Sequence, residues 1–150
     1  MRKIATLGTA CVLIFCTSIS SALSVAGAAF QPLSLADSGK IIRIQGYAAN
    51  TSQTDFVTIA ASFPSNLNDS NPIVDIRIFG NGQFFKCTLS SMNFNTGSSS
   101  STDATTFASG QATLHLALQL VGGDYFHSVR CIMPKQIGLA SSYILAAQIS

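Results

Sequence analysis

The chain has no glutamate and no tryptophan, and charged residues make up only 9% of it. Enzymes that hydrolyse glycosidic bonds normally use two carboxylates at a set separation, and the six scattered aspartates supply such a pair only weakly. The chain has eight Lys and Arg residues and six acidic residues, and the basic residues do not cluster in the sequence. It therefore lacks the positive field that attracts the phosphate backbones of nucleic acids. We therefore predict no nucleic-acid partner.

Histidine is also scarce, since His115 and His127 are the only two in the chain. They are too few and too far apart in the sequence to supply the converging ligands of a zinc site. The oxygen-rich stretch 68–71 lacks the acidic density and spacing of a dedicated calcium loop. We predict neither a metal nor another cofactor.

The N-terminal segment has the pattern of a secretory signal. Two basic residues precede an apolar run that serines interrupt, and Ala26-Gly27-Ala28 offers the small-x-small pattern that a signal peptidase cuts. An uncleaved anchor would need about 20 apolar residues in a row, and the cysteines of the run are poorly placed for lipid attachment. We predict a signal-peptide helix over 1–28 and one secreted or periplasmic domain over 29–150, with no stable membrane span.

Two of the four cysteines lie in this predicted signal, which leaves Cys87 and Cys131 in the exported domain. An even number of cysteines in an oxidising compartment predicts one disulfide. Closing a loop of about 45 residues would stabilise the fold by up to about 4 kcal/mol in the chain-entropy treatment. The alternative is a reactive Cys131 thiol with His127 as its base, which requires the cysteine to stay reduced.

Apolar residues alternate with polar ones along most of the exported domain, and helix signals are nearly absent. In ATLHLALQLV, for example, four leucines share one face of an extended segment. Gly80-Asn81-Gly82 is typical of a tight hairpin, and the serine-rich tract 96–102 of a mobile loop. The fold prediction is an antiparallel β-sandwich of about seven strands, with a small β-barrel as the alternative. The predicted strands are 40–48, 55–63, 73–80, 83–92, 112–121, 125–134 and 141–150.

Short motifs give the chain a resemblance to a loosely defined group of uncharacterised secreted bacterial β-proteins. These motifs are Cys87-Thr88-Leu89, then Cys131-Ile132-Met133-Pro134, then Ser142-Tyr143. Members of that group often carry two further cysteines, both of which this chain lacks. The resemblance implies secretion and a β-fold, supports a disulfide between the two remaining cysteines, and carries no known activity.

Function is the least constrained property. Our first hypothesis is a non-enzymatic module that is structural or binds a surface glycan or another protein. Tyr47, Tyr125 and Tyr143 are the candidate sugar-binding rings, although half-buried packing is the commoner role of strand tyrosines. The alternative is a small secreted hydrolase in which His127 acts with Asp124 and a serine. No Gly-x-Ser-x-Gly elbow accompanies them, and a catalytic triad is defined by geometry rather than by composition.

Overall fold

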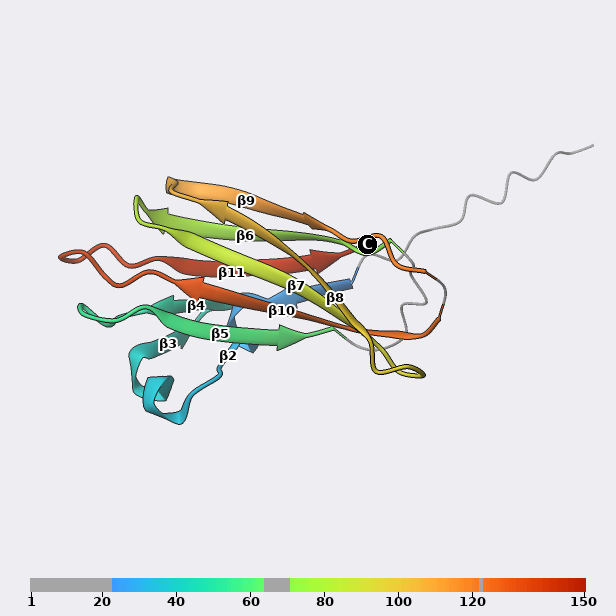
Figure 1. Ribbon diagram of the computed structural model, residues 1–150. Helices are drawn as coiled ribbons and strands as arrows, with labels where there is room; N and C mark the ends of the chain where they lie inside the picture. Colours follow the sequence, from blue (N-terminus) through green and yellow to red (C-terminus); the bar gives the residue numbers. More distant parts are fainter. Residues whose placement is uncertain (1–22, 64–70, 122) are drawn as a thin grey trace, which may run out of the picture.

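The computed structural model describes residues 23–63, 71–121 and 123–150, and eleven strands within these ranges form two antiparallel sheets (Figure 1). Sheet A contains, in spatial order, β3 (Ile41–Ile44), β4 (Tyr47–Asn50), β11 (Tyr143–Ile149), β6 (Ile73–Asn81) and β9 (Ser109–Ala117). Its sixth strand, β1 (Leu23–Ala26), pairs with β11. Sheet B contains, in order, β2 (Gln31–Pro32), β5 (Val57–Ser62), β10 (Tyr125–Met133), β7 (Phe85–Asn93) and β8 (Ser99–Thr106). Two 3-10 turns, η1 (Gly27–Ala29) and η2 (Leu35–Lys40), precede β3.

The core lies between the sheets because alternate residues of each strand point inward. In β6 the inward residues Val74, Ile76 and Ile78 are fully buried, while the residues between them are exposed. The central strand of sheet B repeats the pattern with Val129, Cys131 and Met133. The predicted antiparallel β-sandwich is therefore confirmed, with more strands than seven.

The predicted strand 40–48 is wrong, because this segment is the β3–β4 hairpin. Gln45 and Gly46 form its two-residue turn and both have positive φ, at 49° and 89°. That conformation matches the right-handed twist of paired strands, and glycine adopts it without a steric penalty. The turn has only two residues, so the sequence pattern did not separate the two short strands on either side of it.

The serine-rich tract was predicted to be a loop, but from Ser99 onward it is β8, paired with β7 over its whole length. Its side chains are small and largely exposed, as expected of an edge strand. Gly80-Asn81-Gly82 is not a hairpin either, since it carries the chain from β6 in sheet A to β7 in sheet B. A Cβ at Gly80 would lie 2.2 Å from the Ala108 carbonyl oxygen, so only glycine fits this crossing.

Residues 1–22 of the predicted signal peptide lie outside the described residues, whereas 23–28 belong to the fold. They form β1 and most of η1, and β1 pairs with Ala146–Ile149 of β11. On the same edge of β11, β4 pairs with Tyr143 and Ile144. Two short strands thus cover one edge of β11 in succession. The described residues contain no helix of the length and apolar character needed to cross a bilayer.

Candidate functional site

Three aromatic side chains meet on the outer face of sheet A. The ring of Tyr143 lies 4.9 Å from that of Phe79 and nearly parallel to it, at 6°. On its other side, Tyr143 approaches Tyr47 at 5.1 Å with an angle of 38°. Phe79 is 38% exposed, and both tyrosines are half-buried. We call Tyr47, Phe79 and Tyr143 the aromatic cluster.

The strand register explains why these three rings come together. Tyr143 of β11 is directly opposite Phe79 of β6 and Ala49 of β4. Side chains opposite each other in an antiparallel pair lie on the same face. Ile78, which precedes Phe79, and Ile144, which follows Tyr143, point the other way into the core. The small side chain of Ala49 leaves room for Tyr47, two residues away on the same face, to reach Tyr143.

A hollow of about 460 Å³ lies against one side of the aromatic cluster. Phe79 and Tyr143 form its apolar wall, and Ser109 and Ser141 contribute hydroxyl groups to its lining. The exposed Leu139 lies at its rim. The hollow therefore combines an aromatic wall with polar groups, as small-molecule sites commonly do.

A second, polar depression of about 220 Å³ lies further along the same face, lined by Ser24, Asp75, Arg77, Thr113, Ala146 and Gln148. Phe79, Arg77 and Asp75 are successive outward residues of β6, which places the depression on the same strand as the aromatic cluster. The Nδ1 of His115 lies 2.7 Å from a carboxylate oxygen of Asp75. Asp75 therefore pairs with His115 on the neighbouring strand β9.

Of the three tyrosines predicted to bind, Tyr125 lies elsewhere. It is 6% exposed in sheet B, and its hydroxyl donates a hydrogen bond to the Val121 carbonyl 2.9 Å away. Its ring packs near His127 in the same inward row of β10. Tyr125 therefore stabilises the start of β10 and takes no part in the aromatic cluster.

Phe79 was not among the predicted site residues, although its sequence carries a signal. The alternation that places Val74, Ile76 and Ile78 in the core necessarily turns Phe79 outward. A single exposed aromatic residue is ordinary on a protein surface, so Phe79 marks a site only when the strand pairing places further rings beside it. Two exposed isoleucines of β3, Ile42 and Ile44, extend the apolar surface, because they pair with Ala49 and Tyr47.

The residues of the hydrolase hypothesis do not form an accessible site. The Nδ1 of His127 is 2.8 Å from the Ser91 hydroxyl, and both side chains are fully buried between the sheets. Asp124 is exposed at the chain surface before β10. Because Ser91 is fully buried, a substrate carbonyl cannot reach its hydroxyl oxygen. The His127–Ser91 contact is therefore a hydrogen bond between two polar side chains of the core.

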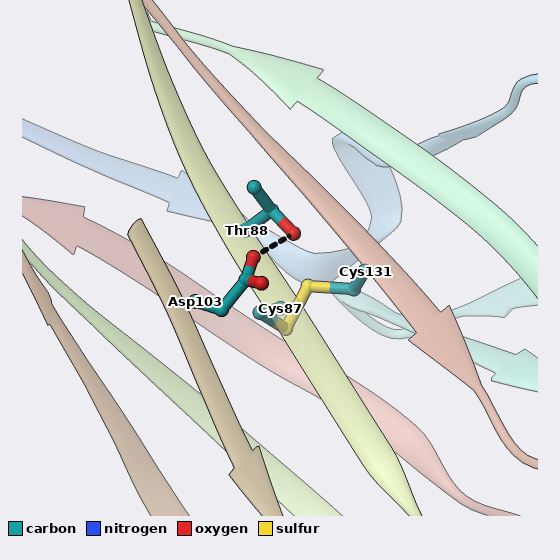
Figure 2. Close-up of a disulfide and its surroundings, with 4 residues drawn as sticks. All are labelled: Cys87, Thr88, Asp103 and Cys131. Carbon is teal, nitrogen blue, oxygen red and sulfur yellow. Dashed lines mark hydrogen bonds between the residues drawn. A yellow bond between two sulfur atoms is a disulfide. The ribbon is translucent and has the colours of Figure 1, made fainter. Parts of the chain in front are cut away.

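Cys87 and Cys131 form the predicted disulfide. Cys87 of β7 and Cys131 of β10 are direct partners in sheet B, with Cα atoms 4.1 Å apart, and both are fully buried. Figure 2 shows the bond joining two neighbouring strands of one sheet. The thiols are therefore unavailable as nucleophiles.

On the outer face of sheet B, Asp103 of β8 contacts two polar side chains of β7. It accepts a hydrogen bond of 2.6 Å from the Thr88 hydroxyl (Figure 2) and lies 2.6 Å from the Lys86 ammonium. The hydrogen bond from Lys86 lowers the pKa of the Asp103 carboxyl, and the bond from Thr88 lowers it further. These contacts tie β7 to the edge strand β8. Within the part of the chain that the structure describes, no three His, Cys or acidic side chains gather as metal ligands would.

Comparisons with known proteins give a fold but no family. No protein-family model matches the chain, and no curated protein does either. Among solved structures, the chain is similar to the CBM36-1 domain of a multidomain xylanase from the hindgut metagenome of Trinervitermes trinervoides. The TM-score is 0.52 at 11% identity, covering 86% of this chain and 96% of that one. The likeness is one of fold. A carbohydrate-binding module CBM36 in complex with calcium and xylotriose also matches, with a TM-score of 0.45 at 12% identity over 85% and 99% of the chains.

Proposed function

We propose that this protein is an exported, non-enzymatic module that binds glycans on the outer face of sheet A. The observation that carries the proposal is the aromatic cluster, in which Tyr47, Phe79 and Tyr143 lie exposed or half-buried beside an open hollow. Export is supported by the buried disulfide and by the signal-like N-terminus. The xylanase CBM36-1 domain supports the fold of the proposed module.

The chemistry of the face suits a neutral, hydroxyl-rich ligand. The C–H faces of a sugar ring are apolar and pack against aromatic rings, while its hydroxyl groups need hydrogen-bond partners. The hollow provides both kinds of group, with two aromatic rings and the hydroxyls of Ser109 and Ser141. Neither the Tyr47 nor the Tyr143 hydroxyl is hydrogen-bonded to a residue within the described ranges, so each can serve a ligand.

The polar depression supplies a second contact region for a longer ligand. Phe79 and Asp75 are four residues apart on β6, a span of about 13 Å along an extended strand. Gln148 and Arg77 are among the side chains that line the depression. A ligand of several sugar units could therefore stack on the aromatic cluster and donate hydrogen bonds to the polar side chains beyond it.

The test is an array of plant and bacterial cell-wall polysaccharides, xylan included, probed with the exported protein. The polysaccharide that binds is then titrated against Tyr143→Ala and Phe79→Ala. We expect each variant to lose about fivefold or more in affinity, because the loss of a stacking contact with an aromatic ring costs about 1–3 kcal/mol. Both residues point away from the core, so folding should be retained, which thermal unfolding verifies.

Sheet B provides a matched control. Phe94 and Phe126 also make an aromatic contact, with ring centroids 6.4 Å apart, and Phe94 is 56% exposed. Phe94→Ala removes an exposed ring of the same size without touching sheet A, so binding should be unchanged. The proposal fails if no polysaccharide binds the parent protein, or if Phe94→Ala weakens binding as much as Phe79→Ala does.

A further inference from the structure

The segment before Phe30 is built into the domain, although the sequence pattern predicts that it is cut off. Leu23 and Val25 of β1 pack against the core, and Ser24 and Ala26, which alternate with them, are exposed. All four residues of β1 pair with Ala146–Ile149 of β11. This is the inside-outside alternation of an ordinary sheet strand rather than the pattern of a discarded peptide.

The turn η1 that follows β1 is equally integrated. Gly27 is buried so closely against β11 that a Cβ would lie 1.9 Å from the Ile144 carbonyl oxygen. The amide of Ala28 donates to the Gly46 carbonyl at 3.0 Å, and the amide of Phe30 donates to the Gly27 carbonyl at 3.1 Å. Phe30 itself is fully buried. The predicted cut after Ala28 would fall inside this turn.

Such a cut would also open an edge of sheet A. The backbone groups of Ala146–Ile149 that face β1 would lose their partners, while β4 continues to cover only Tyr143 and Ile144. Unpaired edges of this kind promote pairing with other chains, and exported domains avoid them. The domain boundary therefore lies before Leu23 and not after Ala28.

The sequence directly before Leu23 has the features of a cleavage site. Ser20-Ser21-Ala22 and Ser24-Val25-Ala26 are also small-x-small patterns, and the first of them follows the apolar run immediately. Ala26-Gly27-Ala28 lies further from that run. We propose that signal peptidase cleaves between Ala22 and Leu23, so that the finished protein begins with β1. This proposal rests on the expected export of the chain and is independent of the glycan-binding function.

The experiment expresses the full 150-residue chain in a secreting bacterial host and determines the intact mass and N-terminal sequence of the exported protein. We expect the product to begin Leu-Ser-Val-Ala. A product that begins at Gly27 or Ala29 would overturn the proposed site. Recovery of only the uncut chain would overturn the export on which the proposal depends.

Two matched variants identify which pattern the peptidase uses. Ser20→Gln places a long polar side chain at the first small position of Ser20-Ser21-Ala22, and Ala26→Gln places one in both of the later patterns. Ala26 is exposed on the outer face, so glutamine there is compatible with the fold. Ser20→Gln should lower the yield of the Leu23 product severalfold, and Ala26→Gln should leave the start at Leu23. The reverse result would assign cleavage to one of the later patterns, after Ala26 or after Ala28.

Discussion

At the residue scale, Asp103 links the pH dependence of stability to one surface contact. The hydrogen bond from Lys86 lowers the pKa of its carboxyl in the folded protein, and Thr88 adds to this effect. A carboxyl with a lowered folded-state pKa stabilises the fold above its unfolded pKa of about 3.9. That contribution is lost as the pH falls through the folded-state value.

We therefore expect Asp103→Asn to flatten the acid limb of the stability curve. In thermal unfolding between about pH 6 and pH 2, the Tm of the variant should fall less than the Tm of the parent protein. The effect is modest because the Asp103 side chain is 47% exposed and solvent screens the pair. Asp124→Asn is the control, since Asp124 is in none of the ion pairs among the described residues. Parallel acid limbs for Asp103→Asn and the parent would contradict the assignment.

Single-residue alternation predicts which face of a strand a side chain occupies, but not which side chains meet there. The alternation that put Cys131 inward also put Tyr125 inward, so the burial of Tyr125 could be read from the sequence. The contact between Tyr47 and Tyr143 could not, because β4 and β11 are distant in the chain and their register is set by tertiary pairing. Phe79 joins them for the same reason.

At the element scale, the disulfide joins β7 and β10 and encloses the segment that crosses between the sheets. The enclosed residues contain β8 of sheet B and β9 of sheet A, and the cysteines are 44 positions apart. Removing the bond frees that long segment in the unfolded chain, which costs about 4 kcal/mol in the chain-entropy treatment. The bond therefore restrains both edge strands at this side of the sandwich.

We expect Cys87→Ala/Cys131→Ala to fold with a Tm lower by on the order of 10 °C. The core supplies enough buried apolar surface for the fold to persist, because residues from both sheets pack between them. Circular dichroism measures the Tm and checks that the β-sheet spectrum is retained. An unchanged Tm would show that the disulfide adds no stability, and a lost β-sheet spectrum would show that the core is insufficient without it.

Strands with strict alternation were predictable, and strands without it were not. The segments of β6, β7 and β10 match their predicted ranges to within two residues, because each buries one apolar face. The strand predicted at 112–121 is β9, but it begins at Ser109 and ends at Ala117. β8 contains Ser, Thr, Ala and Asp, and it is held by pairing with β7 instead of by an apolar face. The crossing at Gly80-Asn81-Gly82 looks like a hairpin locally, since turn residues do not encode which sheet the next strand joins.

At the scale of the whole molecule, two-layer packing was predictable from composition. Abundant β-branched and aromatic residues, regular alternation and few helix signals favour sheets that bury one face each. The barrel alternative is wrong because the strands form two separate sheets. The placement of an apolar surface on sheet A was not predictable, since it requires the order of the strands within the sheet.

The charge of the whole molecule gives a final prediction about the proposed binding. From Leu23 onward the chain has six basic and six acidic residues, so its net charge is about zero. The aromatic cluster and the hollow beside it contain no charged side chain. In the polar depression, the positive charge of Arg77 and the negative charge of Asp75 offset each other. Long-range electrostatic attraction therefore contributes little, and packing and neutral hydrogen bonds must supply the affinity.

We expect the Kd for the polysaccharide found on the array to change less than about twofold when NaCl is raised from about 50 to about 500 mM. Screening at the higher concentration weakens charge-driven binding strongly, whereas stacking on Tyr143 and Phe79 is nearly unaffected. Isothermal titration at the two salt concentrations measures the change, with Phe94→Ala as a folded control. A loss of affinity of tenfold or more would show that charged groups bind the ligand, and would move the site from the aromatic cluster to the depression around Arg77.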